Sequence, residues 1–510
     1  MYAAVHEGFS GTHGQRRQLR NSVQKPSVKK NYIYNLAYQM LAVIIPLMIQ
    51  PYIARVLGAG EVGAFSYTTA ITGYFALVGN LGIATYGQLR VAAFRNDRKV
   101  VSRIFWELAV LRFLLMTGAA VIFLLFIRFL ARPEYKTLYL VLIVQIFAAA
   151  IDIAWLLQGF EEFRKIVLRN TLIKIVSVIL IFAFVKKQSD IYIYALIMNG
   201  STLLGNASIW FFTPSLVERV PFRQLDLKRH LPSCIVYFIP TIATTFYLSL
   251  DKQMITWFTD TSVENGYYEF AQRIEQMAVT VVTSLSIVTM PRMANLFNLN
   301  QVDRLRNRLE QTIRFILLLA VPMCLGLMSV SDYLVPLYLG PGFERSAALL
   351  KIFSLLIIVV GLNNAVGKQV LMPVGRQKEY NMSVILGAIV NFSLNMIMIP
   401  RLFAMGAVTA SVAAETSILL AFIYYSRDYV RLGWILRASV RYLIAGAAMA
   451  GAIVLSRRWI GISWKGLLIQ VAGGGLIYIV TILLLRDAFA LEMLAIIKRN
   501  LPFVKRRGGK

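Results

Sequence analysis

Residues 466–485 read GLLIQVAGGGLIYIVTILLL and contain no charged side chain. An α-helix rises about 1.5 Å per residue, so a run of this length spans the roughly 30 Å hydrocarbon layer of a membrane. Apolar runs of similar length recur from near Asn31 to near Leu485, separated by glycine, proline and charged residues. This pattern predicts an all-α integral membrane protein.

The composition supports a membrane protein and argues against other classes. Of the 510 residues, 58% are hydrophobic, and the mean hydropathy of +0.63 is above that of typical soluble domains. The formal charge of +28 would suit a nucleic-acid-binding protein, but the basic residues lie between apolar runs and not along one stripe, so no nucleic-acid partner is expected. Cys234 and Cys324 lie in apolar runs and predict neither a disulfide framework nor a metal site.

Hydropathy, read against the breaks made by glycine, proline and charge, predicts about 14 membrane-spanning helices. Their expected centres lie near Ile45, Tyr74, Met116, Ala148, Val176, Asn199, Thr245, Val281, Ala320, Ile358, Val390, Glu415, Gly446 and Gly475. The runs around Tyr74 and Val281 are rich in Thr, Ser, Gly and Gln, which is typical of helices that line a wet interior.

The distribution of basic residues predicts the orientation. With Met1 in the cytosol, alternation places roughly 36 Lys and Arg in cytosolic segments and about 11 outside, as the positive-inside rule requires. Both termini are therefore expected in the cytosol, and the basic segments are explained by topology and contact with anionic lipid. Residues 1–30 lack the apolar core of a cleavable signal, so the first span is expected to anchor the chain.

Two short motifs indicate an internal repeat. Gly63-Ala-Phe-Ser-Tyr67 runs on to Arg90, and Gly266-Tyr-Tyr-Glu-Phe270 runs on to Arg292. We therefore expect two parallel six-helix halves that rock around a central cavity, followed by two additional helices. The expected division is a basic N-terminus (1–30), a first half (31–212), a cytosolic linker (213–231), a second half (232–428), two additional helices (429–487) and a basic cytosolic tail (488–510).

Short motifs along nearly the whole chain resemble those of a known family. They are Lys30-Asn31, Pro51-Tyr-Ile-Ala-Arg-Val-Leu-Gly58, Leu81-Gly-Ile-Ala-Thr-Tyr-Gly87, Leu250-Asp-Lys252, Gly266-Tyr-Tyr268, Pro291-Arg-Met293 and Tyr338-Leu-Gly340. In this order they resemble the oligosaccharide flippase family of polysaccharide repeat-unit exporters. The superfamily also contains multidrug and toxin extruders and lipid II flippases.

The resemblance implies a substrate and a place in the cell. The expected substrate is an oligosaccharide on a polyprenyl diphosphate, flipped from the inner to the outer face of a bacterial cell membrane. The product would serve capsule, O-antigen or exopolysaccharide assembly, with a polysaccharide polymerase and other assembly proteins as partners. A multidrug extruder and a lipid II flippase are the alternatives within the superfamily.

Ionisable residues inside the spans are the candidate site residues, because burying a charge in a membrane is costly. Arg55, Lys252 and Arg273 are expected toward the outer side, as a cluster that holds the diphosphate. The resemblance also matches Arg273 to a cavity arginine on the family's eighth helix. The alternative for Arg273 is an ion pair with Glu269, four residues earlier on the same helix face.

Deeper residues complete the set of candidates. Lys174 and Arg112 are further candidate substrate-binding bases in the first half. Asp251, Asp152 and Glu415 are candidates for binding a coupling proton or cation, or for neutralising a nearby base.

Enzyme signatures are missing from the sequence. It shows no nucleophile paired with histidine, no metal-binding cluster and no phosphate-cradling Gly-Lys motif. We therefore expect a transporter without catalytic residues or cofactor, driven by an ion gradient, the membrane potential or consumption of the product. A polytopic glycosyltransferase or polymerase would need a large external loop, and the longest one here, 331–346, is short.

Overall fold

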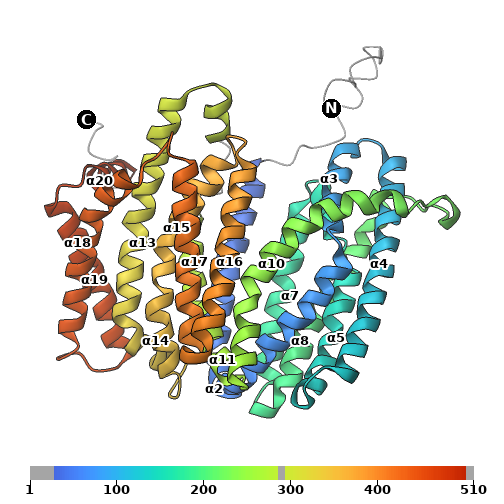
Figure 1. The fold of residues 1–510 in the computed structure, drawn as a ribbon, viewed down its shortest axis with the longest axis horizontal. Helices are drawn as coiled ribbons and strands as arrows, with labels where there is room; N and C mark the ends of the chain where they lie inside the picture. The colour runs from blue at the N-terminus through green and yellow to red at the C-terminus, as the bar shows by residue number, and fades with distance from the viewer. Residues whose placement is uncertain (1–27, 285–292, 501–510) are drawn as a thin grey trace, which may run out of the picture.

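The computed structural model describes residues 28–284 and 293–500, and no β-strand occurs in these ranges (Figure 1). The helices before the linker are α2 (Val28–Asn80), α3 (Ile83–Phe94), α4 (Arg98–Phe129), η1 (Pro133–Tyr135), α5 (Lys136–Ala150), α6 (Ala154–Gly159), α7 (Phe163–Phe184), η2 (Gln188–Asp190) and α8 (Ile191–Ile209). The short helix η3 (Trp210–Phe212) ends this half, and the linker contains α9 (Thr213–Leu216), η4 (Phe222–Gln224) and η5 (Lys228–His230).

The second part of the chain is helical in the same way. Its helices are α10 (Leu231–Thr259), α11 (Val263–Thr283), α13 (Val302–Tyr338), α14 (Glu344–Phe353), α15 (Leu355–Asn363), η6 (Asn364–Leu371), α16 (Gln377–Leu402), α17 (Ala404–Tyr425), α18 (Leu432–Ser456), α19 (Trp464–Leu484) and α20 (Ala488–Asn500). The basic segment 1–27, the tail 501–510 and the motif residues 291–292 lie outside the described residues.

The predicted fold class is confirmed. Every expected helix centre lies within a described helix, and nine helices of the described ranges are long and apolar enough to cross a membrane. The number of about 14 spans stays a prediction. Val281 lies near the end of α11 and not at its middle, because the polar first turns of that helix conceal its start from a hydropathy scale.

Helix α2 contains both of the first two expected spans. Its backbone leaves the helical conformation at Gly58, where φ is 76° and ψ is 177°. A positive φ is accessible to glycine without the steric cost that a Cβ imposes. Helix α2 therefore bends where this motif ends, and Figure 1 shows the blue helix turning at the lower end of the molecule.

The glycines that begin the two echoing motifs lie at one helix crossing. A Cβ on Gly63 would lie 1.8 Å from the carbonyl oxygen of Ser262, and a Cβ on Gly266 would lie 1.9 Å from that of Ala59. The buried amide of Asn265 donates a hydrogen bond to the carbonyl oxygen of Gly63, at 3.2 Å. The backbones of α2 and α11 thus touch directly, which only residues without a side chain permit.

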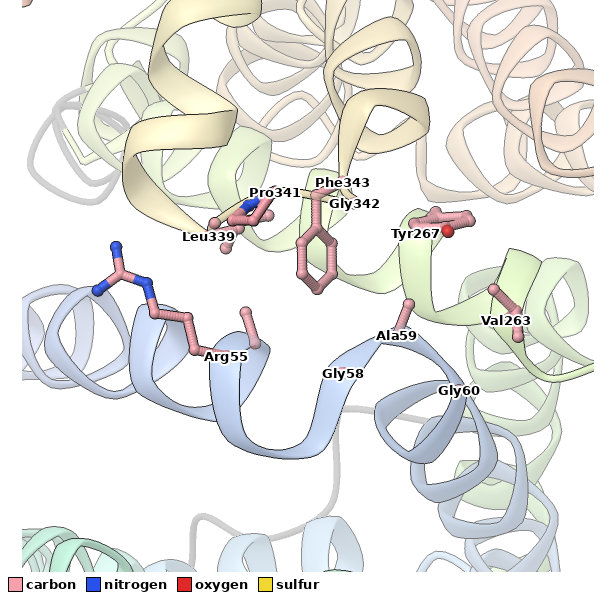
Figure 2. A pocket seen from close by; sticks show the side chains of 12 residues that line it. Arg55, Gly58, Ala59, Gly60, Val263, Tyr267, Leu339, Pro341, Gly342 and Phe343 are labelled. Carbon is pink, nitrogen blue, oxygen red and sulfur yellow. The ribbon is translucent and has the colours of Figure 1, made fainter. Parts of the chain in front are cut away.

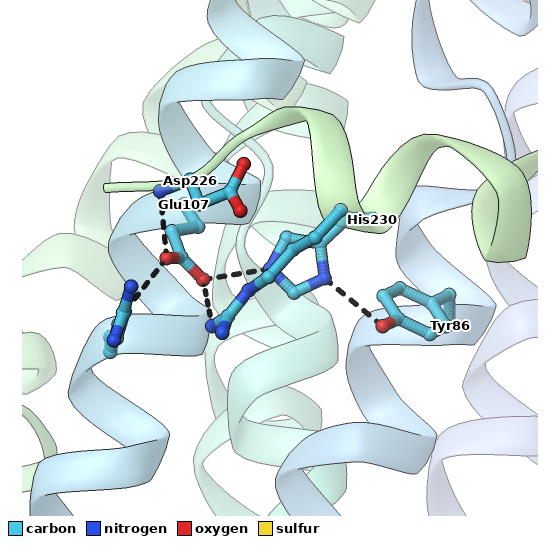
Figure 3. Close-up of polar contacts among 6 residues, drawn as sticks. Tyr86, Glu107, Asp226 and His230 are labelled. Carbon is cyan, nitrogen blue, oxygen red and sulfur yellow. Dashed lines mark hydrogen bonds and ion pairs between the residues drawn. The ribbon is translucent and has the colours of Figure 1, made fainter. Parts of the chain in front are cut away.

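The linker is folded onto the first helices around Glu107 of α4 (Figure 3). This fully buried carboxylate accepts hydrogen bonds from Arg103 Nε at 3.0 Å and from the backbone N–H of Asp226 at 2.9 Å. It also contacts His230 Nε2 at 2.8 Å and forms an ion pair with Arg229. The linker is therefore tied to α4 up to His230, the residue before α10.

We expect Gly266→Ala to destabilise the purified protein by about 1–3 kcal/mol, since overpacking a tight contact forces the backbones apart. Thermal unfolding in detergent measures this loss. The control is Gly118→Ala in α4, where a Cβ would meet nothing within 4 Å. Equal melting temperatures for both variants would show that the crossing is looser than described.

Candidate functional site

A group of ionised side chains surrounds Glu269 of α11. Arg273 Nε lies 2.7 Å from one carboxylate oxygen, one helical turn away. Lys252 Nζ, from α10, lies 2.5 Å from the other oxygen, which also accepts a 2.7 Å hydrogen bond from Ser66 of α2. Three helices from both parts of the chain therefore meet at one carboxylate.

This Lys252–Glu269–Arg273 group carries excess positive charge. One carboxylate faces two bases, which leaves a net charge of about +1 if all three are ionised. The side chain of Glu269 is only 8% exposed, whereas Arg273 is 31% exposed and Lys252 18% exposed. Donors not used by Glu269 are therefore accessible from outside the group.

The structure contains the Glu269–Arg273 ion pair, which is the alternative role predicted for Arg273. It also places Lys252 on the same carboxylate, which separations along the chain could not indicate. A charge swap between Glu269 and Arg273 would place an arginine beside Lys252. The swap would therefore disrupt the group whether Arg273 serves structure or substrate binding.

Arg55 makes its hydrogen bonds elsewhere, at the bend of α2. Its Nη2 donates to the carbonyl oxygen of Leu337 at 2.9 Å and contacts that of Tyr338 at 3.4 Å. These carbonyls end α13, where a cation complements the helix dipole. Figure 2 shows Arg55 and Phe343 beside a cavity of about 470 Å³ between α2, α11 and the loop after α13. The structure thus separates Arg55 from the hydrogen bonds of the Lys252–Glu269–Arg273 group.

Asp251 lies in a second polar group formed by α10, α11, α16 and α17. Its carboxylate accepts hydrogen bonds from Asn395 Nδ2 at 2.6 Å, Ser411 Oγ at 2.6 Å and the Tyr268 hydroxyl at 2.8 Å. Asn395 also donates to Asn391 Oδ1 at 3.1 Å. Among the described residues Asp251 has no ion pair, although it is buried. Neutral donors alone hold this carboxylate.

The remaining candidates lie apart from these two groups. Arg112, 4% exposed, donates to the carbonyl oxygen of Ala149 at 2.8 Å and lies 3.6 Å from Asp152. Asp152 is therefore close enough to neutralise the charge of Arg112, which is the alternative role predicted for it. Lys174 is half-buried on α7, and Glu415 of α17 accepts a 2.7 Å hydrogen bond from Asn363.

Sequence reasoning missed the neutral partners of Asp251 and Glu269. Asn391 and Asn395 lie four residues apart, on one face of an apolar helix. Amides inside a membrane helix are unusual enough to indicate a site, but a hydropathy scale treats them as minor interruptions. Ser66 and Ser411 gave no comparable signal, because an isolated serine usually bonds to its own helix.

Comparisons with known proteins agree with this fold. The model of a family described as polysaccharide biosynthesis protein matches residues 28–297, and that of the MatE family matches residues 237–397. The putative O-antigen transporter of Escherichia coli (strain K12) is 24% identical over 410 residues, which cover 79% of this chain and 98% of the relative.

Two solved structures share the fold at 14% identity. The lipid II flippase MurJ in an inward closed conformation has a TM-score of 0.74 and covers 88% of this chain and 98% of its own. A multidrug resistance MATE family transporter in an inward-facing conformation has a TM-score of 0.61 and covers 80% of this chain and 99% of its own. These likenesses concern the fold alone.

We expect Glu269→Gln to lower stability by about 3 kcal/mol, because it removes a buried carboxylate and leaves two partly buried bases without their shared counter-charge. Adding Lys252→Met should restore part of the loss, since the like-charge repulsion then disappears. Melting temperatures of the two variants measure the coupling, and Glu134→Gln, at an exposed position, is the control. If Glu269→Gln is as mild as the control, the carboxylate does not hold the group together.

Proposed function

Because the chain belongs to the polysaccharide biosynthesis protein family, we propose that it flips a polyprenyl-diphosphate-linked oligosaccharide from the inner to the outer membrane face. The observation that carries this proposal is the excess positive charge of the Lys252–Glu269–Arg273 group inside a helical membrane protein. The name of the E. coli relative, an O-antigen transporter, supports it, and capsule or exopolysaccharide assembly is the same chemical task.

The two bases suit a diphosphate. Arginine can donate two parallel hydrogen bonds to a phosphate, while lysine adds a point charge beside it. A sugar diphosphate cannot cross hydrocarbon unaided, because even one charged side chain costs a few kcal/mol there. In this proposal Arg273 and Lys252 hold the diphosphate in a central polar cavity, while the lipid tail stays in the bilayer.

The closed crossing of α2 and α11 supports an alternating-access cycle. Gly63 and Gly266 hold the two parts of the chain together at the end where α2 bends. In the proposed cycle the two halves part at this end to release the flipped sugar and close again afterwards. A polysaccharide polymerase and other assembly proteins would then take the product at the outer face.

The orientation proposed here follows the positive-inside rule. Helix α2 begins, and α20 lies, at the same upper end of the molecule in Figure 1. The linker, with Arg223, Lys228 and Arg229, packs beside the start of α4. We place this end in the cytosol of a bacterium and the Gly58 bend at the outer face of its inner membrane.

Asp251 is the proposed binding group for the coupling proton or cation. Its carboxylate has three neutral donors and no ion pair within the described ranges, so an additional positive charge would stabilise its ionised form. The oxygen atoms of Asn391 and Ser411 lie close by and suit a hard cation. Asp152 and Glu415 are the other candidates, and Asp152 already faces Arg112.

For transport, we expect Arg273→Lys to retain part of the flipping rate and Arg273→Gln to lose at least about tenfold, because the bidentate phosphate contact contributes more than 1.4 kcal/mol. The assay follows labelled lipid-linked sugar in vesicles of known orientation. Flipping should begin from the leaflet at the linker end. If the wild-type protein exports a cationic dye and does not flip the lipid-linked sugar, it is a multidrug extruder. If it flips lipid II in preference to the lipid-linked sugar, it is a lipid II flippase.

For coupling, we expect Asp251→Asn to fold, because an amide can keep part of the hydrogen-bonding around it. The variant should lose its response to an imposed ion or proton gradient while still binding labelled lipid-linked sugar. Asp303→Asn, at an exposed position near the start of α13, is the control and should respond like wild type. A gradient response that survives in Asp251→Asn would remove Asp251 from the coupling mechanism.

A further inference from the structure

A polar hollow of about 740 Å³ lies away from the groups described above. It is formed by the start of α13 and by the connection between α17 and α18. Arg306, Arg427 and Arg431 line it together with Trp434. Three arginines from two separate segments of the chain thus line one hollow.

The acidic residues of the hollow do not cancel this charge. The carboxylate of Asp428 pairs with Arg376 at 2.8 Å, and its backbone carbonyl accepts a 2.8 Å hydrogen bond from Arg306 Nη2. Glu310 is the other acid in the lining. With Asp428 neutralised by Arg376, three lining arginines face one carboxylate, so the hollow attracts anions.

The depth of the hollow corresponds to the lipid headgroups. The uncharged run of α13 begins at Phe315, and Glu310 lies five residues earlier, which is about 7.5 Å along a helix. The headgroup region on each side of the hydrocarbon is of similar thickness, roughly 5–8 Å. Trp434, near the start of α18, has Arg314 over its ring at 5.5 Å, and tryptophan favours this interfacial level.

The lateral position distinguishes surrounding lipid from the transported substrate. Figure 1 shows α18 and α19 at the edge of the molecule, on the far side of α13 from the crossing of α2 and α11. A ligand in the hollow would therefore lie beside α13 and the start of α18, away from the crossing of α2 and α11. We propose that this hollow binds the phosphate headgroup of an anionic phospholipid from the surrounding membrane. Two or more guanidinium groups can share one phosphate through charge-assisted hydrogen bonds.

The test uses the full chain in phosphatidylcholine nanodiscs, with bound phosphatidylglycerol counted by native mass spectrometry during titration. The triple variant Arg306→Gln, Arg427→Gln, Arg431→Gln should bind phosphatidylglycerol at least about tenfold more weakly, because it loses the charge-assisted hydrogen bonds that arginines donate to one shared phosphate. The control Arg304→Gln, Arg308→Gln, Arg437→Gln removes the same charge from exposed positions outside the hollow. It should weaken binding by less than about threefold, as screened surface charges do.

Three outcomes would overturn the proposal. Equal weakening in both triple variants would mean diffuse attraction without a site. Displacement of phosphatidylglycerol by millimolar inorganic phosphate would assign the hollow to a free anion. Failure of the Arg306, Arg427 and Arg431 variant to flip labelled lipid-linked sugar in purely neutral vesicles, at an unchanged melting temperature, would place the hollow on the substrate path.

Discussion

Ionised side chains buried away from water need a counter-charge or several hydrogen bonds, and this constraint organises the interior of the protein. Glu269 joins α2, α10 and α11 because Ser66, Lys252 and Arg273 all satisfy the same carboxylate. Glu107 fixes the linker by the same physics, and Arg112 meets Asp152 inside the first helices. Each of these polar groups therefore stabilises contacts between separate segments of the chain. The Lys252–Glu269–Arg273 group differs from the Glu107 group in its position, because its side chains come from helices on both sides of the linker.

The two central polar groups lie on neighbouring residues of one helix. Asp251 and Lys252 are adjacent in α10, yet one contacts Asn395 and Ser411 while the other contacts Glu269. A shift of α10 relative to α16 and α17 would alter both environments together. Substrate charge at Lys252 and a proton or cation at Asp251 would then influence each other through helix position, without direct contact between the two ligands.

The sequence predicted the helices well because hydrocarbon leaves a chain few alternatives: apolar runs such as 466–485 must satisfy their backbone groups internally. It placed α11 poorly, since Glu264 and Glu269 make its first turns polar. The Glu269–Arg273 pair followed from helical spacing, but the arrival of Lys252 depends on how α10 and α11 pack. Two of the three partners of Asp251, Asn395 and Ser411, lie 144 and 160 residues away, and no local pattern encodes those contacts.

The crossing of α2 and α11 also determines what water would meet if the two helices separated. Large apolar side chains do not interlock at Gly63 and Gly266, because each glycine faces a backbone carbonyl, of Ser262 and of Ala59. Exposed peptide groups are readily hydrated, whereas each square ångström of apolar surface exposed costs roughly 25 cal/mol. At these two positions the helices can pack closely in the closed state and still separate with a small hydration penalty. Contacts made by the backbone alone can therefore be both close and reversible.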